Sequence, residues 1–408
     1  MIKRNIYSKL KKYIKKKEIL ALIGSRQVGK TTLMKQLFEE DKRKKKFISF
    51  DSETDLNLFE NNIEDFIKLH VKNYDILFID EFQYAKLGGK QLKYIYDTYG
   101  TKVIISGSSA PELTIQSLSY LVGRVFIFTI YPISFTEYLT YTNKDLLEIY
   151  NNKVSLENKH LFDDFFKKFL QFGTYPQVIT QKSEEDKKFV LNSLTSNYLL
   201  KEIKDILAYK SSFEFQNLLK SLALQDGTLL NKSNLGSDLG ININKITEMI
   251  NVLEQTFIVT KLRPVQSKKI KELIKSPKIY FLDYGFKNSL IDNFKPLELR
   301  IDKGEILESF ILSELLKLDK KVKFYNYKNS SEVDFIIEEN NELIGIEVKS
   351  NLTGLKVERG LREFIKKFSP KKIYIFNLNQ EGIINIEDVE VEFLHHLNVA
   401  KIFGGDRK

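Results

Sequence analysis

Residues 18–33 read EILALIGSRQVGKTTL, an apolar run followed by a glycine-bounded loop and the start of a helical pattern. Gly24, Gly29, Lys30 and Thr31 fit the spacing GxxxxGK[ST], which is typical of a loop that binds phosphate groups. Glycines let backbone N–H groups close around phosphate oxygens at the positive end of the following helix. The stretch therefore predicts a strand, a phosphate-binding loop (P-loop) and a helix in an α/β domain.

Lys30 and Thr31 supply the charge and the metal ligand that such a loop needs. The Lys30 ammonium would reach the β- and γ-phosphates of a nucleotide, and the Thr31 hydroxyl would be one ligand of Mg²⁺. A chance glycine turn is the alternative interpretation. The predicted nucleotide-binding residues are Gly24, Ser25, Arg26, Gln27, Val28, Gly29, Lys30, Thr31 and Thr32.

Two acidic residues, Asp80 and Glu81, follow the apolar run Ile76–Ile79. Asp80 fits a carboxylate that holds Mg²⁺ through its water shell, and Glu81 fits a general base that polarises the attacking water. Solvated acids at the end of a strand are the alternative, which the preceding P-loop weakens. We therefore expect metal binding at Thr31 and Asp80, and catalysis at Lys30 and Glu81.

The composition narrows the classes of protein and of site. A chain of 408 residues favours two to four domains, and the lack of cysteine excludes disulfides, thiolate zinc sites and thiol nucleophiles. The net charge of +10 favours polyanionic partners, although a general lysine bias would also produce it. No apolar run is long enough to span a bilayer and the basic N-terminus lacks a secretory signal, so we expect a cytoplasmic protein without membrane contact.

Four ordered modules are expected along the chain. In 1–134, short apolar runs alternate with helical patterns, which predicts a mostly parallel sheet covered by helices. Apolar residues at helical spacing predict a helical lid in 135–209. In 210–283, two short helical patterns around Gly240 precede two strand-like runs, which predicts a winged helix. The last module, 284–408, starts with a helix and continues with strands, so a second α/β domain is expected.

Four segments resemble one known family. GSRQVGKTTL, LFIDEFQ, ISGSSA and LVGRVFIFTIYPISFTEYL are together similar to AAA+-like P-loop ATPases of archaea and bacteria that carry a C-terminal nuclease-like domain. The resemblance spans nearly the whole chain. It implies that the nucleotide is ATP, and the sequence has no NKxD signature for guanine.

The resemblance also implies roles for residues at the ends of two further strands. Ser108, or Ser106 in a shifted register, would sense the γ-phosphate, although capping of a turn explains either serine as well. Arg124 would be an arginine finger, which usually serves a neighbouring subunit and so implies a homo-oligomer. Stabilisation of a helix C-terminus is the alternative role for Arg124.

A second group of charged residues lies in the last module. Period-2 alternation places Glu347 and Lys349 on one face of the strand in IGIEVK, and Asp334 could join them from the neighbouring strand. With Glu308 on the preceding helix, the order resembles the PD-(D/E)xK core of the restriction-endonuclease-like α/β fold, although Val333 replaces the usual proline. The resemblance implies Mg²⁺ and a water activated by Lys349. The implied metal ligands are Glu308, Asp334 and Glu347. A catalytically inactive binding module and a solvent-facing strand are the alternatives.

The winged-helix region offers the expected contacts with DNA. The start of its second helix carries side chains that can hydrogen-bond to base edges, namely Asn244, Lys245, Thr247 and Glu248. Lysines near the two wing strands could meet phosphates, namely Lys268, Lys269, Lys271, Lys275 and Lys278. Packing of this region between the other modules is the alternative. The resulting hypothesis is a Mg²⁺-dependent ATPase that acts on DNA, and its rival is a nucleotide-controlled switch whose nuclease-like domain is inactive.

Overall fold

The computed structural model describes residues 2–86, 88–108, 118–207, 212–265, 272, 275–327 and 331–404. These residues form two compact units. The N-terminal unit comprises Lys3–Pro132 and Ile250–Ile258, and the C-terminal unit comprises Ile133–Met249 and Val259–Lys408 with the first two residues. The lid and the last module lie in the C-terminal unit, whereas the expected winged-helix region is divided between the two units. The predicted boundaries after residues 134, 209 and 283 stay predictions.

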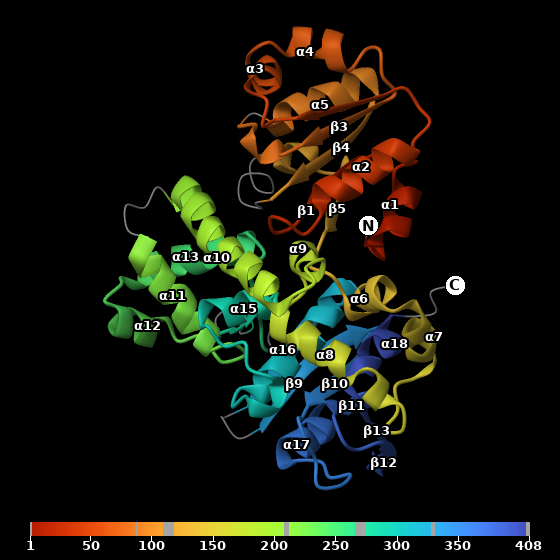
Figure 1. The fold of residues 1–408 in the computed structure, drawn as a ribbon, viewed down its shortest axis with the longest axis vertical. Coiled ribbons are helices and arrows are strands. Elements are labelled where there is room, and N and C mark those ends of the chain that lie inside the picture. The colour runs from red at the N-terminus through yellow and green to blue at the C-terminus, as the bar shows by residue number, and fades with distance from the viewer. Residues whose placement is uncertain are drawn as a thin grey trace. The chain divides into compact units, whose positions relative to one another are not determined.

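Five parallel strands form the sheet of the N-terminal unit, in the order β2-β3-β4-β1-β5 (Figure 1). The strands are β1 (Ile19–Ile23), β2 (Lys45–Ser49), β3 (Ile76–Asp80), β4 (Lys102–Gly107) and β5 (Val125–Thr129). The helices are α1 (Ile6–Tyr13), α2 (Lys30–Glu40), α3 (Glu53–Asn61), α4 (Ile63–His70) and α5 (Gly88–Tyr99). All residues of β1, β3 and β4 are buried, as expected for apolar runs in a parallel sheet covered on both faces. The predicted parallel α/β sheet is confirmed.

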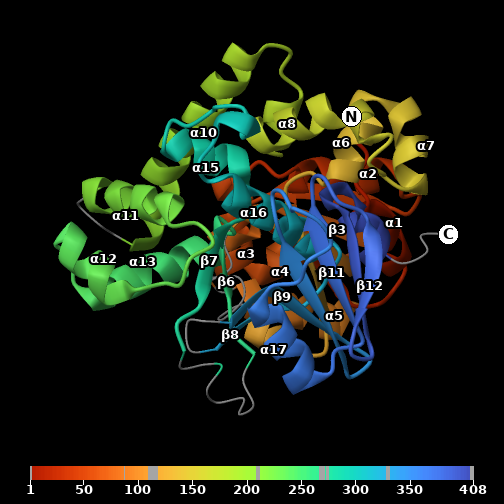
Figure 2. The ribbon, with the colours of Figure 1, turned by 90° about the horizontal axis from the view of Figure 1, so that it is seen from below.

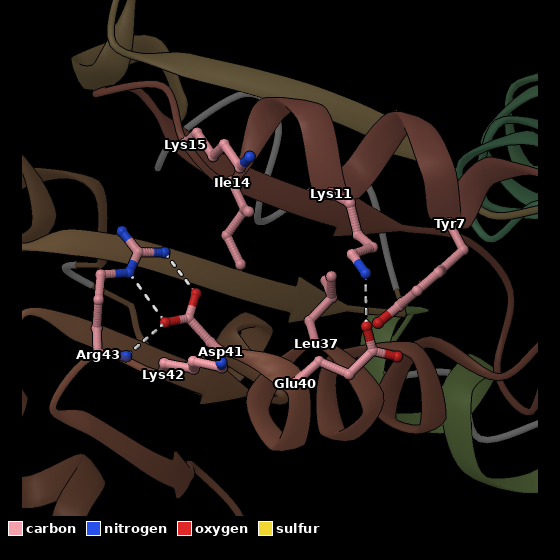
Figure 3. Close-up of a pocket in the computed structure, with 9 residues that line it drawn as sticks. All are labelled: Tyr7, Lys11, Ile14, Lys15, Leu37, Glu40, Asp41, Lys42 and Arg43. Carbon is pink, nitrogen blue, oxygen red and sulfur yellow. Dashed lines mark hydrogen bonds and ion pairs between the residues drawn. The ribbon is translucent and has the colours of Figure 1, made fainter.

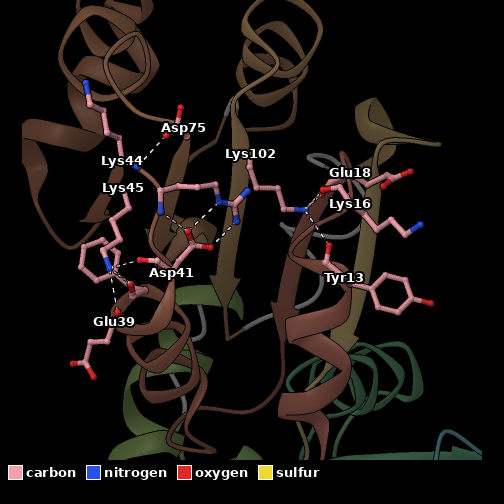
Figure 4. A network of polar contacts seen from close by, with 11 residues as sticks. Tyr13, Lys16, Glu18, Glu39, Asp41, Lys44, Lys45, Asp75 and Lys102 are labelled. Atoms are coloured by element: carbon pink, nitrogen blue, oxygen red, sulfur yellow. Dashed lines mark hydrogen bonds and ion pairs between the residues drawn. The ribbon is translucent and has the colours of Figure 1, made fainter.

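Two lysines at the amino edge of this sheet, opposite the P-loop, bond to backbone carbonyl oxygens (Figure 4). Lys102, the first residue of β4, donates hydrogen bonds to three carbonyl oxygens at and just after the end of α1. Lys45 of β2 donates to three carbonyl oxygens at the end of α2. Helix C-termini leave such carbonyls without partners, and a cation there is stabilised by the helix dipole. The six acceptors belong to Tyr13, Lys16, Glu18, Phe38, Glu39 and Asp41.

Helices predicted as a lid belong to the C-terminal unit. They are α6 (Phe135–Thr142), α7 (Lys144–Asn152), α8 (Asp163–Phe172), α9 (Pro176–Ile179) and α10 (Glu184–Leu207). Phe135, Phe166 and Phe169 contact the ring of Phe310 on α16 (Lys303–Lys317), with centroids 4.9 to 6.3 Å apart. Helices α6 to α9 therefore share a buried core with α16 and the C-terminal sheet. No described helix has the length and apolar content needed to cross a membrane.

The C-terminal sheet has six strands in the order β12-β13-β11-β10-β9-β8 (Figure 2). They are β8 (Val322–Tyr327), β9 (Ser331–Glu339), β10 (Glu342–Val348), β11 (Lys372–Asn377), β12 (Gly382–Ile386) and β13 (Val389–His395). Helices α16, α17 (Arg359–Phe368) and α18 (Val399–Phe403) complete this part. The predicted helix and the strands β8 to β11 are confirmed, whereas β12 and β13 were not anticipated.

The described part of the region predicted as a winged helix contains three helices and a two-stranded antiparallel sheet. The helices are α11 (Ser212–Leu224), α12 (Lys232–Leu239) and α13 (Ile243–Gln255), and the strands are β6 (Val259–Leu262) and β7 (Lys278–Phe281). Gly240 ends α12 in the left-handed conformation, with φ of 66°. This order supports the winged-helix prediction, which stays a prediction.

A tight backbone contact joins the turn after α8 to the start of α15 (Tyr284–Leu290). Gly173 has φ of 72°, and a Cβ there would lie 2.3 Å from Oδ1 of Asp283. A Cβ at Gly285 would lie 2.0 Å from the carbonyl oxygen of Phe172. The backbone N–H and the hydroxyl of Thr174 both donate to Oδ2 of Asp283, at 2.6 and 2.9 Å. Thr174, in the GTYP segment, thus has a structural role that the sequence did not assign.

Candidate functional site

The P-loop has the backbone conformation that its glycines allow. Gly24 and Gly29 have φ of 154° and 96°, and Gln27 between them has φ of 61°. A Cβ at Gly24 would lie 2.2 Å from the carbonyl oxygen of Ile130, so a side chain at this position would collide with backbone. Gly29 is the N-cap of α2, so the loop leads into the positive end of that helix. Together they form a cradle for an anion.

The Lys30 ammonium folds back over this loop. It donates hydrogen bonds to the carbonyl oxygens of Gly24 (2.9 Å) and Ser25 (2.7 Å) and is buried. A lysine is a mobile point charge with three donors, so phosphate oxygens can replace these carbonyls as acceptors. Thr31 follows in the first turn of α2 and is partly exposed, as a metal ligand must be.

Asp80 ends β3, and its carboxylate accepts a hydrogen bond from the Ser106 hydroxyl on the neighbouring strand β4. Both side chains are buried. Because β4 lies between β3 and β1 and all three strands are parallel, Asp80 and Ser106 lie at the same carboxyl edge as the P-loop. Ser106, the alternative sensor, is therefore a partner of Asp80.

Gln83 connects the predicted base to the predicted sensor, and the sequence analysis gave it no role. Its amide nitrogen donates to Oε2 of Glu81, and its amide oxygen accepts the backbone N–H of Ser108 at 3.3 Å. The Ser108 hydroxyl is buried and has no hydrogen-bond partner among the described residues. Glu81 itself has a left-handed backbone, with φ of 54°. The only available signal was the position of Gln83 two residues after Glu81 in LFIDEFQ.

Arg4 is a second residue that the sequence analysis missed. Its guanidinium donates to the carbonyl oxygens of Val28 (2.7 Å) and Tyr131 (2.5 Å). Val28 lies inside the P-loop, so Arg4 fixes the loop from outside the motif. An arginine in a lysine-rich segment carries no sequence signal for such a contact.

Arg124 precedes β5 and so lies at the amino edge of the sheet, away from the P-loop of its own chain. A five-residue strand such as β5 spans about 16 Å. The guanidinium forms an ion pair with Asp97 at 2.8 Å, and its carbon lies 6.0 Å from the ring centroid of Tyr96. A contact of Arg124 with a γ-phosphate therefore requires a second copy of the chain, and the arginine-finger role stays a prediction.

A pocket of about 390 Å³ lies between α1 and the C-terminal end of α2 (Figure 3). Lys11 pairs with Glu40 at 2.7 Å and Arg43 pairs with Asp41 at 2.6 Å within it. Burial, with the nearby carboxylate of Glu40 next, raises the pKa of Tyr7 above its usual range. Since α2 begins at the P-loop, this pocket lies at the wrong end of the helix to receive the phosphates.

The predicted carboxylates of the last module are brought together in the C-terminal unit. Glu347 pairs with Lys349 at 2.9 Å on the same face of β10, as the period-2 pattern predicted. Asp334, on the adjacent strand β9, accepts the backbone N–H of Val348 at 2.8 Å. Glu308 on α16 accepts the hydroxyl of Tyr280 at 3.0 Å. We call Glu308, Asp334 and Glu347 the carboxylate cluster.

The three carboxyl groups resist ionisation. Burial, with the charge of Asp334 next, raises the pKa of Glu347 to about 8 and that of Glu308 well above its ordinary value. Burial also raises the pKa of Asp334. Among the described residues, no three acidic or histidine side chains are arranged to hold a metal ion. The donor set therefore does not fit the Mg²⁺ that the nuclease resemblance implied.

Lys278 was expected to contact DNA phosphates, and this expectation is wrong. It is buried, forms an ion pair with Glu332 and lies 4.0 Å from Oε2 of Glu308. Burial favours the neutral amine, yet the neighbouring carboxylates Glu308, Asp334 and Glu332 raise the pKa of Lys278. Its ammonium is engaged inside the protein because β7 runs beside the carboxylate cluster.

The other predicted DNA contacts divide into three groups. Asn244, Glu248 and Lys275 have exposed side chains. Lys245 is partly buried and forms an ion pair with Glu214. Thr247 donates its hydroxyl to the carbonyl oxygen of Ile243 at 2.9 Å. The remaining three, Lys268, Lys269 and Lys271, lie outside the described residues.

The geometry at the carboxyl edge agrees with sequence similarity to known families. Residues 16–139 match an AAA domain. This part of the chain is an AAA-type, P-loop ATPase-like domain. Residues 163–297 and 303–394 match two domains of unknown function, DUF8612 and DUF4143.

Similar proteins occur in archaea and bacteria. One uncharacterized protein of Methanocaldococcus jannaschii is 26% identical, and the alignment covers 91% of this chain and 85% of that protein. A second uncharacterized protein of the same organism is 27% identical, and its alignment covers 77% of this chain and 71% of that protein. An uncharacterized protein of Haemophilus influenzae is 24% identical, with 66% of this chain and 64% of its own length aligned.

Solved structures resemble the chain only distantly. RuvB of Thermotoga maritima is 16% identical with a TM-score of 0.29, and 66% of this chain aligns with 94% of it. Pif1 helicase from Candida albicans is 16% identical with a TM-score of 0.26, and 48% of this chain aligns with 55% of it. The chain thus spans about half the length of the Pif1 helicases it matches. Likeness of this order establishes no activity.

Proposed function

We propose that the protein is a Mg²⁺-dependent ATPase whose turnover is coupled to DNA. The observation that carries the ATPase proposal is the meeting, at one sheet edge, of the P-loop, the Ser106–Asp80 pair and the Glu81 turn. The match of 16–139 to an AAA domain supports it. Mg²⁺ prefers oxygen ligands, and the Thr31 hydroxyl and the Asp80 carboxylate supply them at this edge.

The described contacts suggest what each side chain does during turnover. Thr31 and Asp80 would hold the Mg²⁺ that accompanies ATP, which would supply positive charge beside the transferring phosphoryl group. Lys30 exchanges its two carbonyl acceptors for phosphate oxygens. Glu81 orients the attacking water and accepts its proton, while Asp80 is held in place by Ser106.

A test of this assignment compares Lys30→Ala and Glu81→Gln with the wild-type protein. Lys30→Ala should lose nucleotide binding, because it removes the ammonium that is expected to contact the β- and γ-phosphates. Glu81→Gln should bind ATP and fail to hydrolyse it. Equal loss of nucleotide binding in both variants would contradict the separate roles.

We infer that Arg124 acts on a neighbouring copy of the chain. Its position at the amino edge, on the far side of the sheet from its own P-loop, supports this. Mixing Glu81→Gln with Arg124→Ala tests it, because some interfaces in mixed oligomers then join an intact Glu81 with an intact Arg124. Activity regained on mixing supports action between subunits, and a mixture as inactive as its components contradicts it.

DNA is the proposed partner because the net charge is +10 and exposed polar side chains lie at the start of α13. Such binding should weaken steeply with salt, since phosphate contacts release counterions. The affinity for a DNA duplex is measured between low and physiological salt for the wild type and for Asn244→Ala. The salt dependence reports phosphate contacts, and the difference between the two proteins reports base contacts. Affinity that is indifferent to salt would contradict binding through phosphates.

The Gln83–Glu81 hydrogen bond favours a second candidate function. It holds the predicted base before nucleotide binds, which suits a nucleotide-controlled switch with slow turnover. ATP binding would then change affinity for a partner without rapid hydrolysis. ATP hydrolysis unaffected by DNA, together with DNA affinity that differs between the ATP-bound and ADP-bound protein, would favour the switch over the DNA-coupled ATPase.

A further inference from the structure

Lys278 is a buried lysine beside the carboxylate cluster. It begins β7, which pairs with β6, and its side chain reaches toward α16 and β9. Two carboxylates contact it, Glu332 as an ion pair and Glu308 at 4.0 Å. The lysine is only 5% exposed, so its charge is shielded little by water.

The members of the carboxylate cluster already have partners. Glu308 has Lys278 and the Tyr280 hydroxyl, Asp334 has the Val348 N–H, and Glu347 has Lys349. Oε2 of Glu347 is the oxygen of this cluster that is buried without a hydrogen-bond partner among the described residues. These partners engage one oxygen of each carboxylate that a divalent cation would need as a ligand.

A buried ammonium also excludes a divalent cation by charge. Lys278 forms an ion pair with Glu332 and lies 4.0 Å from Glu308, so its ammonium is held beside these carboxylates. A metal between Glu308 and Asp334 would meet this like charge in a buried, poorly screened environment. Replacing the ammonium would leave the carboxylates with uncompensated negative charge that a divalent cation can neutralise.

We propose that Lys278 is a built-in cation that takes the place of the nuclease metal, so that the carboxylate cluster binds no divalent cation until Lys278 is removed. The C-terminal unit then cuts no DNA through this cluster. This inference concerns a site separate from the P-loop, and it holds whether or not the ATPase proposal does.

The experiment is Mn²⁺ binding, followed by electron paramagnetic resonance of the free ion, without nucleotide. Wild type and Lys278→Met are compared, each with and without Asp334→Asn. Lys275→Met is the matched control, because Lys275 is an exposed lysine three residues earlier in the chain. The proposal expects Mn²⁺ binding that depends on Asp334 in Lys278→Met, at least about tenfold tighter than in wild type or Lys275→Met.

Two results would overturn the proposal. One is Mn²⁺ binding by the wild-type protein that disappears in Asp334→Asn. The other is a folded Lys278→Met protein that gains no Mn²⁺ affinity. If Lys278→Met does not fold, Lys278→Gln replaces it, and the wild-type measurement decides by itself whether the native cluster binds metal. Nicking of plasmid DNA by the wild type with Mn²⁺, lost in Asp334→Asn, would also overturn it.

Discussion

At the scale of single residues, Gln83 joins two parts of the nucleotide site. It donates to Glu81 and accepts from the backbone of Ser108, so it links the residue after β3 to the residue after β4. Ser108 and Glu81 belong to different strand ends, and no other described side chain bonds to both. Gln83 is therefore a positioning residue for whatever Glu81 does.

Gln83→Leu should lower the rate of ATP hydrolysis by up to about 100-fold, because Glu81 loses the group that orients it. Affinity for ATP should change little, since Gln83 contacts no residue of the P-loop in the described structure. Steady-state kinetics separate kcat from KM, with Gln91→Leu on α5 as the control. An unchanged kcat would remove Gln83 from the catalytic arrangement.

Sequence patterns predicted those site residues that lie within short motifs. Lys30, Asp80 and Glu81 follow from the P-loop spacing and an acidic strand end, and the Glu347–Lys349 pair follows from strand periodicity. The contacts of Arg4 with Val28 and of Gln83 with Ser108 could not be predicted, because these partners lie far away in the chain. Lys278 was misassigned for the same reason, since its distant carboxylate partners do not appear in the local pattern.

At the scale of elements, the contact between the α8 and α15 turns limits which residues fit. Gly285→Ala would place a Cβ 2.0 Å from the carbonyl oxygen of Phe172, so backbone must move. We expect a loss of about 2 kcal/mol or more in the free energy of unfolding. Gly304→Ala in the first turn of α16 is the control, because a Cβ there has no neighbour within 4 Å.

Urea denaturation followed by circular dichroism measures both glycine variants. Gly304→Ala should be neutral or slightly stabilising, as alanine favours helix over glycine. Equal stability of Gly285→Ala and wild type would show that the two turns are not in close contact.

Elements were predictable where one local pattern dominated. Continuous apolar runs bounded by polar residues predicted the parallel strands, because both faces of such a sheet are covered. The strands β12 and β13 were missed, although VEVEF alternates with period two, because short strands near a chain end resemble a polar tail. The assignment of α6 to α8 to the C-terminal core required the ring contacts with Phe310, which no local pattern shows.

At the scale of the whole molecule, two buried histidines make stability depend on pH. Burial lowers the pKa of His395 to about 3 and that of His396 well below its ordinary value of 6.5. Below pH 6.5 the unfolded chain binds protons that the folded protein does not. Stability present above that pH is therefore lost as pH falls toward 3, by about 1.4 kcal/mol per pH unit for each histidine.

His396→Phe should lose less stability than the wild type between pH 6 and pH 4. Its free energy of unfolding should fall less steeply with decreasing pH, by about the slope that one bound proton contributes. His160→Gln is the control, because His160 is exposed. Urea midpoints at several pH values measure the slope. An identical slope in His396→Phe and wild type would show that another group controls acid unfolding.

The measurement that tests the central claim most directly is Mg²⁺-dependent ATP hydrolysis by wild type and Glu81→Gln, with and without duplex DNA. ATP binding is measured in parallel with a fluorescent analogue. We predict hydrolysis by the wild type that DNA stimulates, and Glu81→Gln that binds ATP but turns over at least about 100-fold more slowly. Hydrolysis by Glu81→Gln at the wild-type rate would contradict the assigned site, and wild-type turnover indifferent to DNA would contradict the coupling.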